Sequence, residues 1–241
     1  MSLPEIHYTM LSQYFVCPKK LWWQKMNARG PLSAAIMYGC VFHKSMEYAL
    51  TGQNYSVQKF MDEFLHNIDI TQNNWDGRIM YRPEDPMPND MVSWMEQAIG
   101  LCLGYRKTKP QMVELSLSHE YPELCVLAGR IDALWDGKIV DFKLAGKFYK
   151  PDPLQAACYT ILNGGPGSFE FVVIRKESVP RLEVVPIPQV KSRAYLDWVV
   201  NEIIIPGAKA VFEGPYPANP GTPLCSKMFC SFYEMCAGRV R

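Results

Sequence analysis

The sequence predicts one mixed α/β domain, and three observations carry that prediction. Three β-rich segments follow one another at 113–121, 124–135 and 138–144. Amphipathic helical patterns precede these segments, and a helix followed by two more β-rich segments comes after them. Hydrophobic residues make up 48% and charged residues 20% of the 241 residues, which is an ordinary globular composition. Helices packed on a single sheet account for this order better than two separate domains do.

The part of the chain before residue 110 is predicted to be mainly helical. Helical patterns cover 9–26, 34–50, 55–66 and 91–107, and the polar, turn-rich stretch 67–90 is expected to form a long loop or lid. The first pattern is interrupted at Cys17-Pro18, because proline lacks the amide hydrogen that a helix interior needs.

One of these helices carries polar residues in phase. Gly39, His43 and Glu47 recur at every fourth position and therefore share one face of the helix. A single helical histidine is more often a core residue than a ligand, but this phasing favours a ligand role for His43.

The stretch GRIDALWDGKIVDFK predicts a β-hairpin. Asp136-Gly137 is typical of a two-residue type I′ turn between strands. Counting outwards pairs Leu134 with Ile139, Ala133 with Val140, and Asp132 with Asp141. Because side chains alternate along a strand, the expected apolar face holds Ile131, Ala133, Val140 and Phe142, and the opposite face holds Asp132, Asp141 and Lys143.

Two carboxylates opposed in this way repel each other unless a counter-charge lies between them. A divalent metal ion is one such counter-charge, and Lys143 lies next to the pair on the same face. Carboxylates and an imidazole suit Mg²⁺ or Mn²⁺, with the imidazole favouring Mn²⁺. The alternative is a solvated hairpin face with an incidental pair of aspartates.

After the hairpin, a helix is predicted from Pro153 to about Leu162, with strands at 169–175 and 181–187 and a long helix at 190–212. Gln155 and Tyr159 lie one turn apart and share a face of the first of these helices. Glu120, near the start of the hairpin region, is either a second carboxylate supporting the metal site or a strand-edge residue.

The eight cysteines divide into two sets. Cys40, Cys102, Cys125 and Cys158 lie singly in apolar runs and are expected to be buried thiols. Cys225, Cys230 and Cys236 are clustered and, with the distant Cys17, suggest a metal centre holding either zinc or an iron–sulfur cluster.

Charge and hydropathy narrow the class of protein. A net charge of +1 argues against a protein that coats nucleic acid non-specifically. No apolar run reaches transmembrane length and the first residues do not form a signal peptide, so a soluble intracellular protein is expected, with no membrane partner.

These motifs together resemble the PD-(D/E)XK nuclease superfamily. GRID supplies Asp132, DFK supplies Asp141 and Lys143, LQAACY matches a Q-x-x-x-Y signature, and GCVFHKSME matches a G-x-x-x-H-x-x-x-E helix. This combination is similar to the RecB-type nuclease domains and the Cas4 proteins. Cas4 and AddB types also carry one cysteine before and three after the nuclease core, although their usual C-x2-C-x5-C pattern is C-x4-C-x5-C in this chain.

The resemblance implies a restriction-endonuclease-like core that hydrolyses phosphodiester bonds of DNA. It implies catalytic roles for Asp132, Asp141, Lys143, Gln155 and Tyr159, and metal binding by His43, Asp132, Asp141 and the backbone carbonyl of Phe142. Glu47 is a candidate for a supporting carboxylate, as is Glu120 in the first of its two interpretations. The resemblance also implies a structural [4Fe–4S] cluster on Cys17, Cys225, Cys230 and Cys236, in preference to zinc.

The expected organisation is a single nuclease domain spanning 1–241. Segments 1–30 and 214–241 would be joined by the metal cluster, 34–110 would be helical around the loop 67–90, and 111–190 would form the catalytic core. The resemblance favours an exonuclease acting on single-stranded DNA ends, in the cytoplasm of a bacterial, archaeal or phage-infected cell. Recombination, repair or CRISPR adaptation proteins would be its partners. The alternatives are a non-catalytic DNA-binding or adaptor module on the same fold, and a Cas4-type processing endonuclease.

Overall fold

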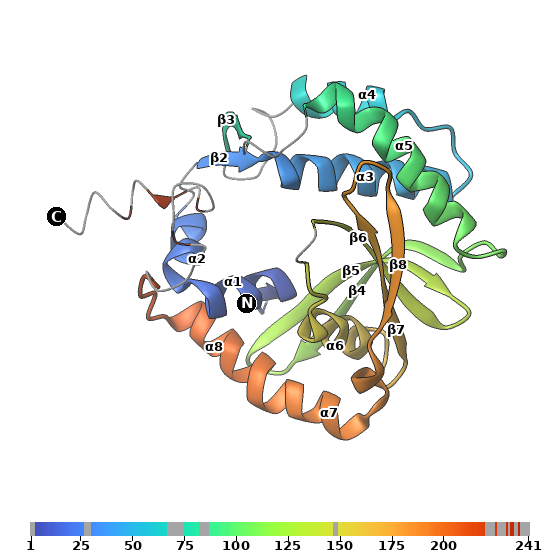
Figure 1. Ribbon diagram of the computed structural model, residues 1–241. Helices are drawn as coiled ribbons and strands as arrows, with labels where there is room; N and C mark the ends of the chain where they lie inside the picture. The colour runs from blue at the N-terminus through green and yellow to red at the C-terminus, as the bar shows by residue number, and fades with distance from the viewer. Residues whose placement is uncertain are drawn as a thin grey trace.

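A six-stranded mixed sheet forms the centre of the protein (Figure 1). The computed structural model describes residues 3–26, 30–66, 75–81, 87–146 and 149–219, together with residues 225, 230, 232, 233 and 236, and of residues 30, 31, 75–78 and 80 the backbone alone. The strands are β1 (Glu5–His7), β4 (Met112–Tyr121), β5 (Cys125–Trp135), β6 (Lys138–Ala145), β7 (Ser168–Arg175) and β8 (Arg181–Pro186). Their order is β1-β5-β6-β7-β8, with β4 paired to β5. The β1–β5 and β6–β7 pairs are parallel and the others antiparallel, which confirms the mixed α/β class.

Helices cover both faces of the sheet (Figure 1). On one face, α3 (Ala34–Leu50), α4 (Val57–His66) and α5 (Pro88–Gly104) pack in a core with inward residues of the strands. On the other, α1 (Tyr8–Val16), α2 (Pro18–Lys25) and α6 (Pro153–Leu162) share a second core with the last helix. These bounds confirm the helices predicted from periodicity, including the interruption at Cys17-Pro18.

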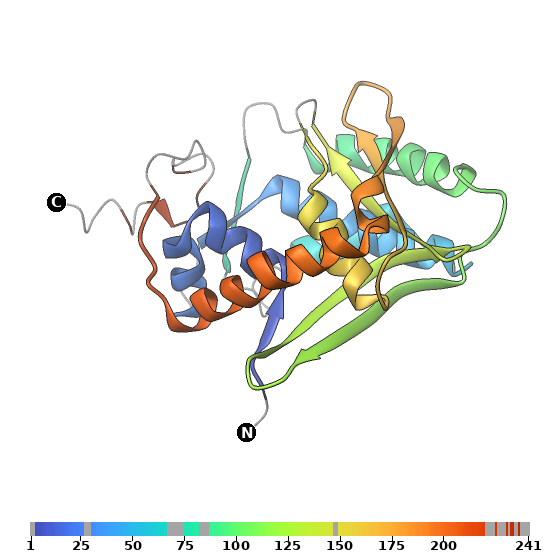
Figure 2. The ribbon, with the colours of Figure 1, turned by 90° about the horizontal axis from the view of Figure 1, so that it is seen from below.

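The predicted helix 190–212 is a composite helix. A 3₁₀ turn (Pro188–Lys191) leads into α7 (Arg193–Trp198), a π-helical segment (Val199–Ile204) and α8 (Ile205–Glu213). Pro206 explains the widened segment, because it has no amide hydrogen for the preceding turn and its ring crowds the carbonyl four residues earlier. Figure 2 shows α1 lying beside this composite helix.

The stretch 67–90, predicted to be a loop, contains regular structure. Within it, β3 (Trp75–Met80) pairs in parallel with β2 (Gly30–Ser33), and α5 begins at Pro88. Residues 67–74 and 82–86 lie outside the described residues. Among the helices that the structure describes, none is both long and apolar enough to cross a membrane.

The strand β5 changes partner along one of its edges. It pairs with β4 over nearly its whole length, so β1 and β6 must lie along its other edge. On that edge β1 pairs with residues 126–128 and β6 with residues 133–135. Between them, no strand of the described chain pairs along this edge with residues 129–132, the GRID stretch, although β4 pairs with most of these residues along the opposite edge. This break in the sheet is where the site described below is located.

The predicted hairpin register is confirmed at three pairs: Ala133 with Val140, Leu134 with Ile139, and Trp135 with Lys138. The ladder ends before Asp132 and Asp141, so the expected pairing of these two residues is wrong. The carboxylate of Asp132 instead accepts a hydrogen bond of 2.7 Å from the backbone N–H of Phe142. A side chain thus replaces the next step of the ladder, and the two strands separate from this point.

At Asp132 the side chains of the β4–β5 pair switch to the opposite face of the sheet. Val113 and Ala133 oppose each other and pack in the core under α3, whereas Leu115 and Ile131 oppose each other and pack in the core under α6. Residues two apart in a regular strand would lie on the same face, so the expectation that Ile131 shares a face with Ala133 is wrong. The intervening Glu114 has φ of 51°, a left-handed conformation that is rare for residues other than glycine.

Candidate functional site

A pocket of about 650 Å³ opens at the break in the sheet. Its walls come from β1 and α1, from one face of α3, from β4, β5 and β6, and from α6. The lining residues are His7, Tyr8, Thr9, Ile36, Gly39, Cys40, His43, Lys44, Glu47, Glu114, Ala128, Gly129, Arg130, Asp132, Asp141, Lys143, Gln155 and Tyr159. Seven residues that the sequence singled out for catalysis, metal binding or support therefore lie around one cavity: His43, Glu47, Asp132, Asp141, Lys143, Gln155 and Tyr159.

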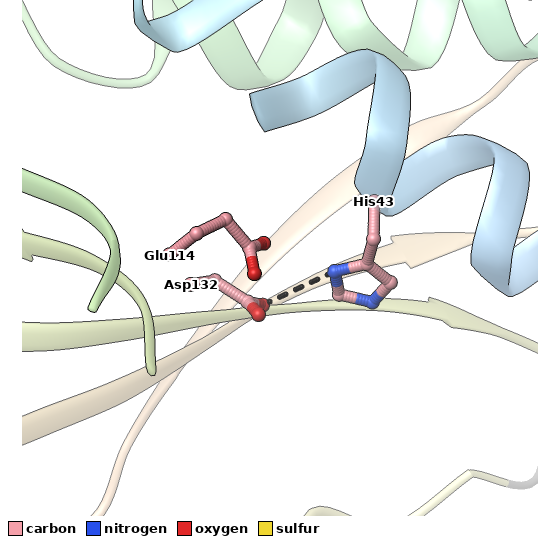
Figure 3. Close-up of side chains that lie close together, drawn as sticks. All are labelled: His43, Glu114 and Asp132. Carbon is pink, nitrogen blue, oxygen red and sulfur yellow. Dashed lines mark ion pairs between the residues drawn. The ribbon is translucent and has the colours of Figure 1, made fainter. Parts of the chain in front are cut away.

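Three potential metal ligands converge on one side of this pocket (Figure 3). His43 from α3, Asp132 from β5 and Glu114 from β4 each offer a ligand atom, and these atoms lie within 4.8 Å of one another. The Nδ1 atom of His43 lies 3.4 Å from Oδ2 of Asp132. The carboxylate of Glu114 is held by Arg130, whose Nε lies 2.7 Å from Oε2. The distorted backbone at Glu114 coincides with this convergence, as strained residues often do at functional sites.

Asp141 and Lys143 form a second, more buried group beside the first. Asp141 is 2% exposed, and its Oδ2 lies 2.6 Å from Nζ of Lys143. Its Oδ1 accepts a hydrogen bond of 3.0 Å from Nε2 of Gln155 on α6. Both carboxylate oxygens of Asp141 are thus held by neighbouring side chains in a fixed orientation.

The two aspartates have opposite electrostatic environments. Burial raises the pKa of Asp141 to about 6, although Lys143 opposes the shift. Burial acts in the same direction on Asp132, but there the imidazole of His43 and the neighbouring donors outweigh it and hold its pKa below the ordinary value.

The pKa values of the neighbouring His43 and Lys143 are shifted as well. Burial lowers the pKa of His43, but the carboxylate of Asp132 outweighs it, so the net pKa is raised. Burial likewise opposes the charge of Lys143, and Asp141 and Asp132 together raise its pKa. Burial and the charge of Asp132 raise the pKa of Glu114. Such displacements in both directions within one pocket are typical of functional sites.

Helix α6 is held beside the pocket by contacts at its N-terminus. Asp152 caps the helix by accepting a hydrogen bond of 2.8 Å from the Leu154 amide, and it also accepts one from the hydroxyl of Tyr8. Gly129 lets α6 approach β5 closely, because a Cβ atom there would lie 3.0 Å from the ring of Tyr159. Burial, with the charge of Asp141, raises the pKa of Tyr159 to about 12, which keeps its hydroxyl protonated at neutral pH.

The carboxylate that completes the ligand group is one that the sequence does not reveal. Glu120, the residue expected either to support the metal or to sit at a strand edge, pairs with Val126 near the far end of β4 and does not line the pocket. Glu114, six residues earlier, takes that place, and those six residues span roughly 20 Å of strand. Glu47 does line the pocket and forms an ion pair of 2.9 Å with Lys44.

The prediction of four buried thiols is confirmed for Cys102, Cys125 and Cys158 and is wrong for Cys40, which is exposed and lines the pocket.

The chain folds back so that its C-terminal part lies against the α1–α2 junction, where Cys17 is located. The amide of Lys19 donates to the carbonyl of Pro217, and Nδ2 of Asn219 donates to the carbonyl of Val16. Nε1 of Trp23 donates to Sγ of Cys236 at 3.1 Å. Burial raises the pKa of Cys230, and Lys20, Cys236 and Cys17 are among the groups that influence it electrostatically.

Comparisons with known proteins identify the fold and nothing finer. No protein-family model matches the chain, and no curated protein matches it. A solved structure named "Putative exonuclease", from Eubacterium rectale, superposes with a TM-score of 0.58 at 14% identity, covering 92% of this chain and 86% of its own. A second structure, named SSO0001, gives a TM-score of 0.49 at 12% identity and covers 98% of this chain and 87% of its own. The chain therefore shares the fold of the first of these proteins.

The donor set of the pocket fits a hard divalent cation. Two carboxylates and one imidazole can approach one ion together, and such ligands bind Mg²⁺ and Mn²⁺. The ammonium group of Lys143 pairs with Oδ2 of Asp141 at 2.6 Å, while the three potential ligands are His43, Glu114 and Asp132.

Proposed function

We propose that the protein is a metal-dependent deoxyribonuclease of the PD-(D/E)XK type that hydrolyses phosphodiester bonds in the pocket at the break in the sheet. One observation carries the proposal. His43, Glu114 and Asp132 on one side, and Asp141, Lys143 and Gln155 on the other, meet in a single cavity although they come from five separate elements. Burying the charge of Asp141 is itself unfavourable, so the stability of the fold does not account for that residue.

The Mg²⁺ or Mn²⁺ ion would be held by the side chains of His43, Asp132, Glu114 and Asp141 and by the backbone carbonyl of Phe142. Bound there, the ion would lower the pKa of a coordinated water and polarise a phosphate oxygen. Lys143 would orient that water or neutralise charge that develops on the phosphate. Gln155 fixes the orientation of Asp141, and Tyr159 offers a protonated hydroxyl to the DNA backbone.

The test is incubation of purified protein with end-labelled single- and double-stranded DNA in Mg²⁺, Mn²⁺ or chelator. We expect metal-dependent cleavage that Asp132→Ala, Asp141→Ala and Lys143→Ala each abolish. Glu120→Ala is the matched control, because it removes an exposed carboxylate of the same sheet outside the pocket. Binding of DNA without cleavage under every metal condition would instead favour a non-catalytic DNA-binding module.

We further propose that the enzyme works from the ends of single strands. The residues proposed for catalysis form one cutting centre within the described part of the chain, so cleavage of both strands of a duplex would need two encounters or two chains. The net charge of +1 also provides no broad field for gripping a duplex. The competing candidate is a Cas4-type processing endonuclease, which would not require a free end.

The four cysteines Cys17, Cys225, Cys230 and Cys236 are proposed to hold a structural [4Fe–4S] cluster rather than zinc. The hydrogen bonds that bring residues 217–219 and Cys236 to the α1–α2 junction support this proposal. Anaerobically purified protein should be brown and contain about four irons per chain. Stoichiometric zinc in iron-replete, oxygen-free preparations would overturn it.

A further inference from the structure

The face of α3 that lines the pocket contains an apolar portion beside its metal-binding portion. Gly39 and Cys40 lie one helical turn before His43, Ile36 lies two turns before it, and all three line the same cavity. Ile36 is 51% exposed although it is a large aliphatic residue. Helical side chains lean towards the N-terminus, so the imidazole of His43 is directed over the turn that contains Gly39.

Gly39 is not explained by the packing of the described chain. A glycine inside a helix is unfavourable relative to alanine, so it usually has a structural reason. Gly207 in α8 has one, because a Cβ atom there would lie 2.7 Å from the side chain of Leu11. Gly129 in strand β5 is likewise explained by packing, since a Cβ atom there would lie 3.0 Å from Tyr159 and Leu162. A Cβ atom at Gly39 would meet nothing within 4 Å, and the residue lies in regular helix. The space beside Gly39 is therefore open and continuous with the pocket.

We propose that Gly39 is the position where the substrate comes closest to α3. In this arrangement the sugar and base next to the scissile phosphate pack on the apolar surface formed by Ile36, Gly39 and Cys40. The phosphate itself lies towards His43, Asp132 and Lys143. This inference rests on the proposed function, and it adds that the surface of α3 recognises the nucleoside rather than the phosphate. Gly39 would then be a positioning residue that keeps this surface clear.

The experiment compares Gly39→Ala and Gly39→Leu with a matched control on another helix. Gly100 lies on an exposed face of α5, and a Cβ atom there would also meet nothing within 4 Å, but it does not line the pocket. Gly100→Leu therefore makes the same chemical change in a helix without touching the site. Three quantities are measured for each variant: the melting temperature, the Mn²⁺ affinity by calorimetry, and the Kd for a labelled single-stranded oligonucleotide in Ca²⁺ by fluorescence anisotropy.

We expect both leucine variants to melt at or above the wild-type temperature, by about 2–4 °C, because each replaces a helical glycine. Oligonucleotide binding should weaken by at least about tenfold in Gly39→Leu, to a smaller extent in Gly39→Ala, and not in Gly100→Leu. Mn²⁺ affinity should stay within about twofold in all three. Wild-type DNA affinity in Gly39→Leu would overturn the inference, as would a parallel loss of Mn²⁺ affinity, which would place the effect on His43.

Failure of this inference is distinguishable from failure of the proposed function. Cleavage by the wild-type protein and its loss in Asp141→Ala test the proposed function and do not depend on Gly39. A protein that cleaves DNA in this way while Gly39→Leu binds and cleaves normally would retain the nuclease assignment and lose only the substrate path along α3.

Discussion

Replacing Asp141 with asparagine should stabilise the metal-free protein while it abolishes cleavage. Asp141 is 2% exposed, and its pKa is raised from the ordinary value of 3.8 to about 6. One pKa unit corresponds to about 1.4 kcal/mol, so ionising this carboxyl in the folded state costs up to about 3 kcal/mol. The neutral amide of Asp141→Asn avoids that cost. Its carbonyl can face Lys143 while Gln155 turns its own amide to accept the other hydrogen bond.

The size of this stabilisation depends on pH. Because the pKa is higher in the folded state than in the unfolded chain, the penalty is absent below pH ~4 and complete above pH ~6. In chelator at pH 8, Asp141→Asn should therefore melt higher than the wild type, by up to about 6–12 °C for a chain of this length. At pH 4 the two proteins should melt together. Added Mg²⁺ or Mn²⁺ should reduce the difference at pH 8, since only the wild type retains every metal ligand.

Asp132→Asn is the matched control and should behave in the opposite way. The pKa of Asp132 is lowered, so its ionised form stabilises the fold at neutral pH and that contribution is lost as the pH falls. The melting temperatures of both variants, measured between pH 4 and pH 8, test these two opposite expectations. If Asp141→Asn melted at or below the wild type at pH 8 in chelator, the cost of burying the Asp141 charge could not be the largest effect of the substitution. A gain that persisted unchanged at pH 4 would equally refute the reasoning.

Three further predictions concern ligands and substrate ends. Glu114→Gln should weaken Mn²⁺ binding by at least about tenfold in calorimetry, whereas Glu120→Gln should leave it unchanged; equal affinities would remove Glu114 from the ligand set. Cys17→Ser should lose iron and lower the melting temperature, while Cys40→Ser should keep its iron, as measured by metal analysis after anaerobic purification. A closed circular single strand should resist digestion while a linear strand of the same sequence is degraded; equal rates of loss would show an endonuclease.

The features that sequence predicted well are those that local chemistry specifies. The Asp136-Gly137 turn has φ of 49° and 73°, as a type I′ turn requires, and it set three pairs of the hairpin register correctly. The helical phase of His43 likewise predicted which face of α3 meets the pocket. Both signals extend over a few residues and need no knowledge of the rest of the chain.

The features that sequence missed arise from contacts between distant segments. Glu114 occupies an ordinary position in an alternating strand pattern. Only the change of face in the β4–β5 pair, at Glu114 and Asp132, turns its side chain towards the pocket. The same distortion moved Ile131 to the other face. A left-handed φ at a glutamate leaves no signal in composition or periodicity, so Glu120 was an equally reasonable choice. The parallel pairing of β2 with β3 was invisible for the same reason.

The way the pocket is closed has a consequence for when the protein can become active during synthesis. One of its walls, at His7, Tyr8 and Thr9, is held by β1, which pairs with β5 across 121 residues of sequence. The helix that follows is held in turn by Asn219, 203 residues beyond Val16. Contacts of such long range form late, after the intervening chain has left the ribosome and folded. We therefore expect the pocket to stay incomplete in nascent chains until the segment around Asn219 has been translated. Under the nuclease function proposed above, an unfinished chain would then not cleave nucleic acids near the ribosome.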